Sequence, residues 1–195
     1  MTSDAHQHFG PPILGIRTRI RGYTIAQQLD EAAPGTREML AADAAGACVV
    51  LRVPDNERMA HRMKAEANLA QRHLSSAIVQ SVGLLEHDAW PVQVLEHVDG
   101  LRLDTLTLLY GALPAEAACR VGWKIGVALS ELHGKKPVMA HGALSAERII
   151  VDAHGQPRLR DLGRIDPDQH EHMMSPERRE VLGGQLRGQR PRGVE

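Results

Sequence analysis

The segment that decides the fold is His141-Gly142-Ala143-Leu144-Ser145-Ala146-Glu147-Arg148-Ile149-Ile150-Val151, and Asp161-Leu162-Gly163 follows ten residues after it. The apolar, β-branched end of this segment predicts a strand. Residues 158–160 predict its hairpin partner, because His154-Gly155 between them is typical of a turn. The sequence therefore predicts a histidine-containing loop, then a hairpin, then an aspartate directly after the hairpin.

Upstream of this segment, strand and helix patterns follow one another in an order typical of an α+β domain. The apolar residues of the longer helices recur at three- and four-residue steps, which places them on one face. Pro114 and Gly134 mark the start and the end of the longest helix. The predicted strands are 20–29, 39–42, 48–53, 78–85 and 92–98, and the predicted helices are 56–74, 101–109 and 114–133.

Composition is typical of a globular chain without a strongly charged surface. Of 195 residues, 43% are hydrophobic and 24% are charged, which is enough for a real core. A formal net charge of -1 argues against a nucleic-acid or membrane partner. Cys48 and Cys119 lie in predicted regular elements, so we expect buried thiols and no disulfide. No signal peptide or apolar run of about 20 residues is present, so we expect a cytoplasmic protein.

The His141 segment and Asp161-Leu162-Gly163 resemble the catalytic loop and the magnesium-binding motif of protein kinases, H-R-D-L-x-x-x-N and D-F-G. His141, Leu144, Glu147 and residues 149–151 fall in the register of the family pattern. Met174-Ser175-Pro176-Glu177 resembles the A-P-E motif that closes the kinase activation segment. The resemblance implies an α+β, protein kinase-like fold of the serine/threonine type.

The resemblance also implies a division of the chain. Residues 20–98 would form the β-rich small lobe, and residues 99–177 would form the first, mainly helical part of the large lobe, truncated after the A-P-E-like motif. Residues 1–19 are expected to be a flexible extension. Residues 178–195 are rich in Arg and Gly and are expected to be disordered.

The chain departs from the kinase pattern where the chemistry is done. Ala143 stands at the catalytic-base position and cannot accept a proton, so no catalytic residue is assigned. Arg148 stands where the family has its metal-binding Asn, and a guanidinium offers no lone pair to magnesium. Ser145 replaces the lysine of the catalytic loop. The resemblance thus implies a kinase fold with impaired phosphotransfer.

Arg52 and Glu66 are predicted to form an ion pair. Glu66 lies on the apolar stripe of its helix, and a carboxylate buried there needs a partner. Arg52 is the only cation in the preceding strand, on the face shared by Cys48 and Val50. By resemblance, Arg52 stands at the V-A-I-K lysine, which pairs with a glutamate of the adjacent helix. Whether the pair serves a nucleotide or only the structure is left open.

Three further features bear on nucleotide binding. Residues 95–100 resemble the kinase hinge, in which the backbone around Glu96 and Val98 would bind an adenine edge. The glycine-rich loop is poor, because residues 30–35 keep only Gly35 and carry two acids. Asp161 resembles the magnesium-holding aspartate, and the alternative is that it pairs with Arg52 or Arg148.

These observations predict a pseudokinase that binds a protein partner and, weakly, a nucleotide such as ATP or ADP, with the need for magnesium left open. The expected nucleotide-contacting residues are Arg52, Glu66, Glu96, Val98, Arg148 and Asp161, with Asp161 as the expected metal ligand. One alternative is a weakly active phosphotransferase that uses Asp161 and Arg148. A second is a shortened gene product without a defined role.

Overall fold

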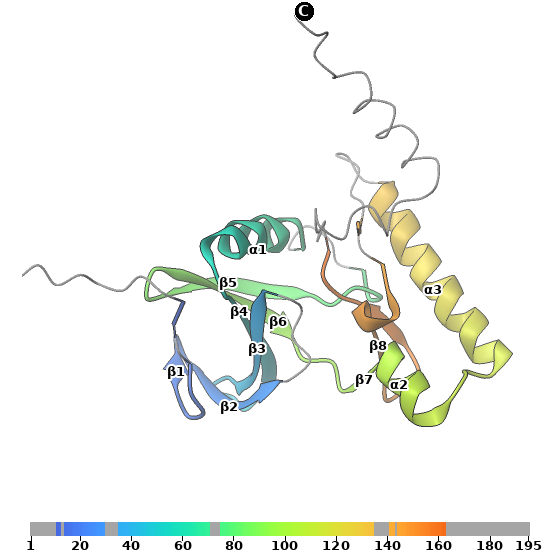
Figure 1. Cartoon of the computed structure of the whole chain (residues 1–195), viewed down its shortest axis with the longest axis horizontal. Helices are drawn as coiled ribbons and strands as arrows, with labels where there is room; N and C mark the ends of the chain where they lie inside the picture. The colour runs from blue at the N-terminus through green and yellow to red at the C-terminus, as the bar shows by residue number, and fades with distance from the viewer. Residues whose placement is uncertain are drawn as a thin grey trace, which may run out of the picture.

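The computed structural model describes residues 11–12, 14–29, 35–70, 75–134, 141–142 and 144–162. Several predicted features lie outside these ranges: most of the acidic loop at 30–34, Leu74, Ala143, Gly163, the A-P-E-like motif and the Arg/Gly-rich tail. Two lobes follow one another along the chain (Figure 1).

The first lobe is built on a six-stranded sheet in which every neighbouring pair is antiparallel. Its strand order is β1-β2-β3-β4-β6-β5, so only the β4–β6 step departs from sequence order. Between β4 and β5 the chain forms a helix. The strands are β1 (Arg19–Ile20), β2 (Tyr23–Leu29), β3 (Thr36–Ala42), β4 (Cys48–Pro54), β5 (Ser81–His87) and β6 (Trp90–Glu96).

The pairing register gives the sheet two different faces. Glu38 lies opposite Arg52, and Arg52 opposite Gln93, so these polar side chains share one face. Val50, two residues before Arg52, lies on that face too, as the sequence predicts. The residues in between alternate to the other face and form an apolar cluster. Leu14 is buried in that cluster, so part of the expected flexible extension, residues 1–19, packs on the first lobe.

Helix α1 (Glu57–Ala70) packs against β4, β5 and β6 (Figure 1). The Asn56 side chain caps its N-terminus, because Oδ1 accepts a 2.9 Å hydrogen bond from the Met59 backbone N–H. Met63 and Ala67 are buried on the inner face, and Glu66 lies on the same side of the helix. The helix therefore brings a carboxylate to the polar face of the sheet.

The second lobe contains two helices and a small sheet. α2 (Leu103–Tyr110) has no fully buried residue, whereas the stripe of α3 (Ala115–His133) packs on the small sheet. The sheet is antiparallel, in the order β7 (Gly100–Arg102), β8 (Ile149–Asp152), β9 (Pro157–Leu159), and the 3-10 helix η1 (Ala146–Arg148) precedes β8. The predicted hairpin around His154-Gly155 is thus confirmed.

Most predicted elements are present, with a few corrections. Pro114 is the N-cap residue of α3 and not its first helical position, and Gly134 is the C-cap as predicted. Of the predicted α3 stripe, four residues are buried, but Ala118 is exposed. The expectation of buried thiols is wrong. Cys48, at the start of β4, and Cys119, on the outer face of α3, are both free and exposed.

No helix in the described part of the chain is long and apolar enough to cross a membrane.

Gly100, the first residue of β7, is expected to tolerate no side chain. A Cβ built there would lie 2.8 Å from the Asp152 Cα and closer still to the Val151 carbonyl oxygen, both backbone atoms of β8. Gly100→Ala should therefore lower the free energy of unfolding by about 1–3 kcal/mol. Urea denaturation would measure it. Gly126→Ala in α3 is the matched control, because nothing lies within 4 Å of its Cβ and alanine favours the helix. Equal effects of the two changes would contradict the packing described.

Candidate functional site

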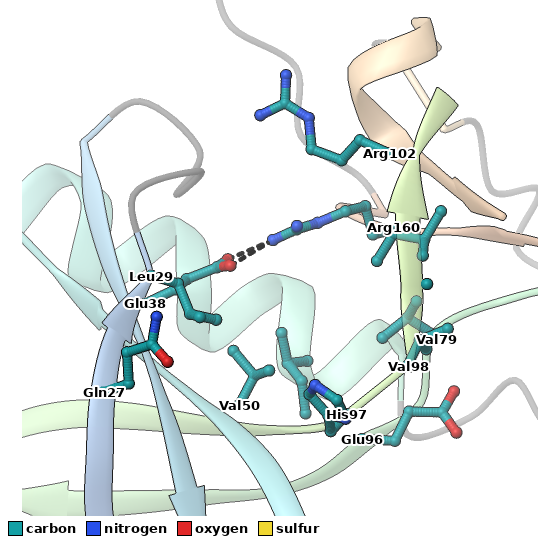
Figure 2. A pocket seen from close by; sticks show the side chains of 13 residues that line it. Gln27, Leu29, Glu38, Val50, Val79, Glu96, His97, Val98, Arg102 and Arg160 are labelled. Carbon is teal, nitrogen blue, oxygen red and sulfur yellow. Dashed lines mark hydrogen bonds and ion pairs between the residues drawn. The ribbon is translucent and has the colours of Figure 1, made fainter. Parts of the chain in front are cut away.

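A cavity of about 310 Å³ lies between the two lobes (Figure 2). Both lobes and the chain that joins them contribute to its walls. The volume is within the range of small-molecule sites in proteins. The lining residues are Gln27, Leu29, Glu38, Val50, Val79, Leu95 and Glu96 from the first lobe, His97 and Val98 from the connecting chain, and Gly100, Arg102, Ile150 and Arg160 from the second lobe.

The character of the cavity changes from one side to the other. Leu29, Val50 and Ile150 give it aliphatic walls. Residues 97–98 line it just beyond the last β4–β6 ladder pair, so their backbone amides are not committed to that ladder. On the opposite side, charged side chains close the space between the lobes. The cavity thus combines an apolar slot, a backbone edge and a charged end.

Arg52 does not line the cavity, but it is the centre of an ion cluster next to the charged end. Its side chain is 1% exposed, and three carboxylates surround it. Nε donates to Glu38 Oε1 at 2.7 Å, and Nη1 donates to Glu66 Oε1 at 3.1 Å. Nη2 donates to Asp161 Oδ1. The predicted Arg52–Glu66 pair is confirmed, and it is one part of a larger cluster.

Arg160 adds a second cation to this cluster. Its Nη2 donates to both carboxylate oxygens of Glu38, at 2.5 and 2.6 Å. Its Nε lies 3.6 Å from Asp161 Oδ2. In Figure 2 the Arg160 side chain extends from the second lobe toward Glu38 of the first lobe, and the pair crosses the space between them. We call Glu38, Arg52, Glu66, Arg160 and Asp161 the interlobe ion cluster.

The charges of the cluster stabilise one another. Burial alone would lower the pKa of Arg52, but the carboxylates of Asp161, Glu38 and Glu66 outweigh it and hold the pKa well above its usual value. Burial raises the pKa of Glu38, and Arg52 and Arg160 together bring it below its usual value. Glu38 and Arg52 are therefore ionised at neutral pH. With formal charges, the three carboxylates and two guanidinium groups of the cluster sum to -1.

Asp161 has a left-handed backbone, with φ at 64°. Such a conformation is uncommon for a residue other than glycine, and aspartate tolerates it better than most. It carries the carboxylate of a residue after β9 into the space beside Arg52. The expected pairing of Asp161 with Arg52 is present.

His141 and Arg148 lie beside the end of β9. His141 Nε2 donates to the Arg160 carbonyl at 2.8 Å, and the Arg160 N–H donates to the Arg148 carbonyl at 2.9 Å. Burial lowers the pKa of His141, so the imidazole is neutral at pH 7. The Arg148 side chain is 8% exposed, and within the described part of the chain its Nη1 is buried without a hydrogen-bond partner.

The hinge-like residues take different roles. Val98 lines the cavity, as its predicted role requires. The Glu96 side chain accepts a 2.8 Å hydrogen bond from the Gln80 N–H and forms an ion pair with Arg158, so it fastens the connecting chain to neighbouring segments. Glu96 and Val98 both border the cavity, but Glu66 and Asp161 meet at the ion cluster next to it.

Magnesium does not fit these residues. In the described ranges, no three His, Cys, Asp or Glu side chains are grouped so that they could hold a metal. One Asp161 oxygen accepts from Arg52, and the other lies near Arg160. Arg148, at the second expected ligand position, has no lone pair to offer. Guanidinium groups therefore take the place beside Asp161 that a cation would need.

Sequence reasoning missed Glu38 and Arg160. Glu38 directly precedes the predicted strand 39–42, and its place in the same alternation was the signal that could have found it; the structure includes it in β3 and buries it. Arg160 is the residue before Asp161 and ends the hairpin. Neither partner could be assigned from the sequence, because the two residues are 122 positions apart.

No protein-family model matches the chain. Over 109 residues the chain is 28% identical to a probable serine/threonine-protein kinase of Clostridium perfringens. The matched segment covers 56% of this chain and 16% of that protein. Among solved structures, it superposes on PpkA-294 in its apo form with a TM-score of 0.71 and 14% identity, covering 84% of this chain and 68% of that one.

A Rad53 structure in complex with AMP-PNP gives a TM-score of 0.69 and 19% identity over 83% of this chain and 44% of that one. A double mutant of the Mycobacterium tuberculosis PknI kinase domain gives a TM-score of 0.64 and 18% identity. That match covers 77% of this chain and 64% of the PknI chain. The fold is protein kinase-like. The first lobe with α1 is the kinase-like small lobe, and the second is part of a kinase-like large lobe. The chain spans less than half of the Rad53 chain and about a sixth of the curated relative.

Removing Arg52 should destabilise the kinase-like domain far more than removing an exposed arginine. Arg52→Ala leaves three carboxylates close together, two of them buried, and should cost about 3–5 kcal/mol of unfolding free energy. Arg120→Ala breaks an exposed i,i+4 pair with Glu116 and should cost less than about 1 kcal/mol. Denaturant unfolding measures both. In a double-mutant cycle, Arg52→Ala and Glu66→Ala should couple by more than about 0.5 kcal/mol, and simple additivity would refute the pair.

The stability should fall on mild acidification, in part through His141. Its folded pKa lies below the unfolded value of about 6.5, so the unfolded chain binds more protons as the pH falls through that value. His141→Gln keeps a donor for the Arg160 carbonyl and should lose less stability between about pH 7.5 and pH 5.5 than the wild type. His154→Gln, in the exposed β8–β9 turn, is the control and should behave as the wild type. Equal pH slopes for all three proteins would be evidence against this role.

Proposed function

We propose that this chain is a catalytically inactive, protein kinase-like module that acts by binding a protein partner. The observation that carries the proposal is the interlobe ion cluster. It satisfies Asp161 and Arg52 with each other and with neighbouring side chains. Two residues that a kinase would use for metal and phosphate are therefore engaged in structural ion pairs.

The residues at the other catalytic positions support the same proposal. Ala143 offers no group to accept a proton, and loss of a positioned base costs about 10²–10⁴-fold in rate. Arg148 cannot ligate a metal. Phosphotransfer of the serine/threonine kinase type would need each of these functions from some other residue.

Exposed apolar side chains on the large lobe support a protein partner. On α2, Leu108 is 84% exposed, and Leu109 and Tyr110 are exposed beside it. On α3, Trp123 is 68% exposed. Aromatic side chains such as Tyr110 and Trp123 are typical of interface anchors, and the two leucines add apolar surface beside Tyr110. Nucleic acid is a poor partner for a chain with a formal net charge of -1.

The cavity supports weak binding of a nucleotide such as ATP or ADP. Its aliphatic walls and the backbone of residues 97–98 suit a planar heterocycle without any particular polar side chain. The Rad53 structure, which shares the fold, was solved with AMP-PNP. Since the residues beside Asp161 do not fit magnesium, such binding should not depend on that metal. A cytoplasmic location remains a prediction of the sequence.

The protein should transfer no phosphate. With radiolabelled ATP, magnesium or manganese and generic protein acceptors, the wild type should label nothing above an Asp161→Asn variant. The substitution keeps the size of the side chain and removes the charge that any residual metal chemistry would need. Labelling that disappears in the Asp161→Asn variant would contradict the proposal and favour a weakly active phosphotransferase instead.

A further inference from the structure

We infer that the interlobe cavity selects an uncharged, planar nucleoside-like ligand over its phosphorylated forms, and that Glu38 determines this preference. The inference rests on the proposed function, because it concerns the same cavity. It differs from the expectation for a kinase-like site, in which cations and metal ions bind the phosphates. Two features carry it: the placement of Glu38 and the pairing of both cations that line the cavity.

Glu38 places a full negative charge at the charged end of the cavity. Its carboxylate lines the cavity, is 2% exposed and is ionised at neutral pH. The interlobe ion cluster to which it belongs has a formal charge of -1. Phosphate groups entering from the apolar slot would therefore meet a site that already has an excess of negative charge. An uncharged ligand would meet no such repulsion.

Both cations that line the described cavity are already paired. Arg160 binds both oxygens of Glu38. Arg102 donates from Nε to Asp104 Oδ1 at 2.9 Å and from Nη2 to the other oxygen. A phosphate could recruit Arg160 only by separating it from Glu38, which would leave a buried carboxylate with fewer donors. Neither arginine is thus available to a phosphate without loss of an existing ion pair.

The remainder of the cavity suits the uncharged part of such a ligand. Leu29, Val50 and Ile150 can cover the faces of a flat ring, and the backbone of residues 97–98 can bind its polar edge. None of these contacts involves a charge. Removal of phosphates from the ligand therefore sacrifices no favourable contact that the described residues offer.

Calorimetric titration with adenosine, AMP and ATP at constant ionic strength tests the inference. The dissociation constant should rise in that order, by at least about tenfold from adenosine to ATP, and magnesium should change none of the values more than about twofold. Glu38→Gln keeps the size of the side chain and an acceptor for Arg160 but removes the charge. This variant should lower the ratio of the ATP dissociation constant to the adenosine dissociation constant by about tenfold, because only ATP binds more tightly.

Two controls make the result specific. Glu86→Gln removes an exposed carboxylate of β5 and should leave the ratio unchanged. A thermal melt of Glu38→Gln checks that it folds, and if it does not, the wild-type series alone decides. ATP binding as tight as adenosine, or no adenosine binding at millimolar concentration, would overturn the inference. Neither result would affect the proposed inactivity, which only the labelling experiment tests.

Discussion

A buried guanidinium is the constraint on which the site depends. Arg52 lies in the middle of a central strand, and burial of an unpaired charge there would cost several kcal/mol. Its three donor positions point in different directions, so no single carboxylate can satisfy them. The chain provides one carboxylate from the neighbouring strand β3, one from helix α1 and one from the segment after β9. These three elements must therefore meet at Arg52 in the folded chain.

The same cluster holds the two lobes together. Glu38 and Arg52 belong to the small lobe, and Arg160 and Asp161 belong to the segment that ends the β8–β9 hairpin. Ion pairs that join them across the cavity restrict how far the lobes can separate. In a nucleotide-dependent enzyme a ligand and its metal can bridge such lobes, whereas here the side chains of the protein itself form the bridge. The kinase-like arrangement is thus stabilised without a ligand.

Sequence reasoning recovered what depends on local periodicity. The spacing of α1 placed Glu66 on the inner face, and the β-strand alternation placed Arg52 beside it, so their pair could be predicted. The partnership of Glu38 with Arg160 depends on strand register and on how the lobes pack, which no local pattern encodes. The expectation for the two cysteines fails for different reasons. Cys48 is the first residue of β4, where the strand is still exposed, and Cys119 lies on the exposed side of α3.

A fold and its chemistry make separate demands on a sequence. The apolar slot requires only aliphatic side chains and a backbone edge, and many sequences can meet that need. Phosphate transfer requires a base, a metal ligand and an uncommitted cation at fixed points. In this chain Arg160 adds positive charge near Asp161, and both oxygens of Glu38 pair with it. These ion pairs satisfy the buried charges together, and they make a different demand on the sequence from the one that phosphate transfer makes.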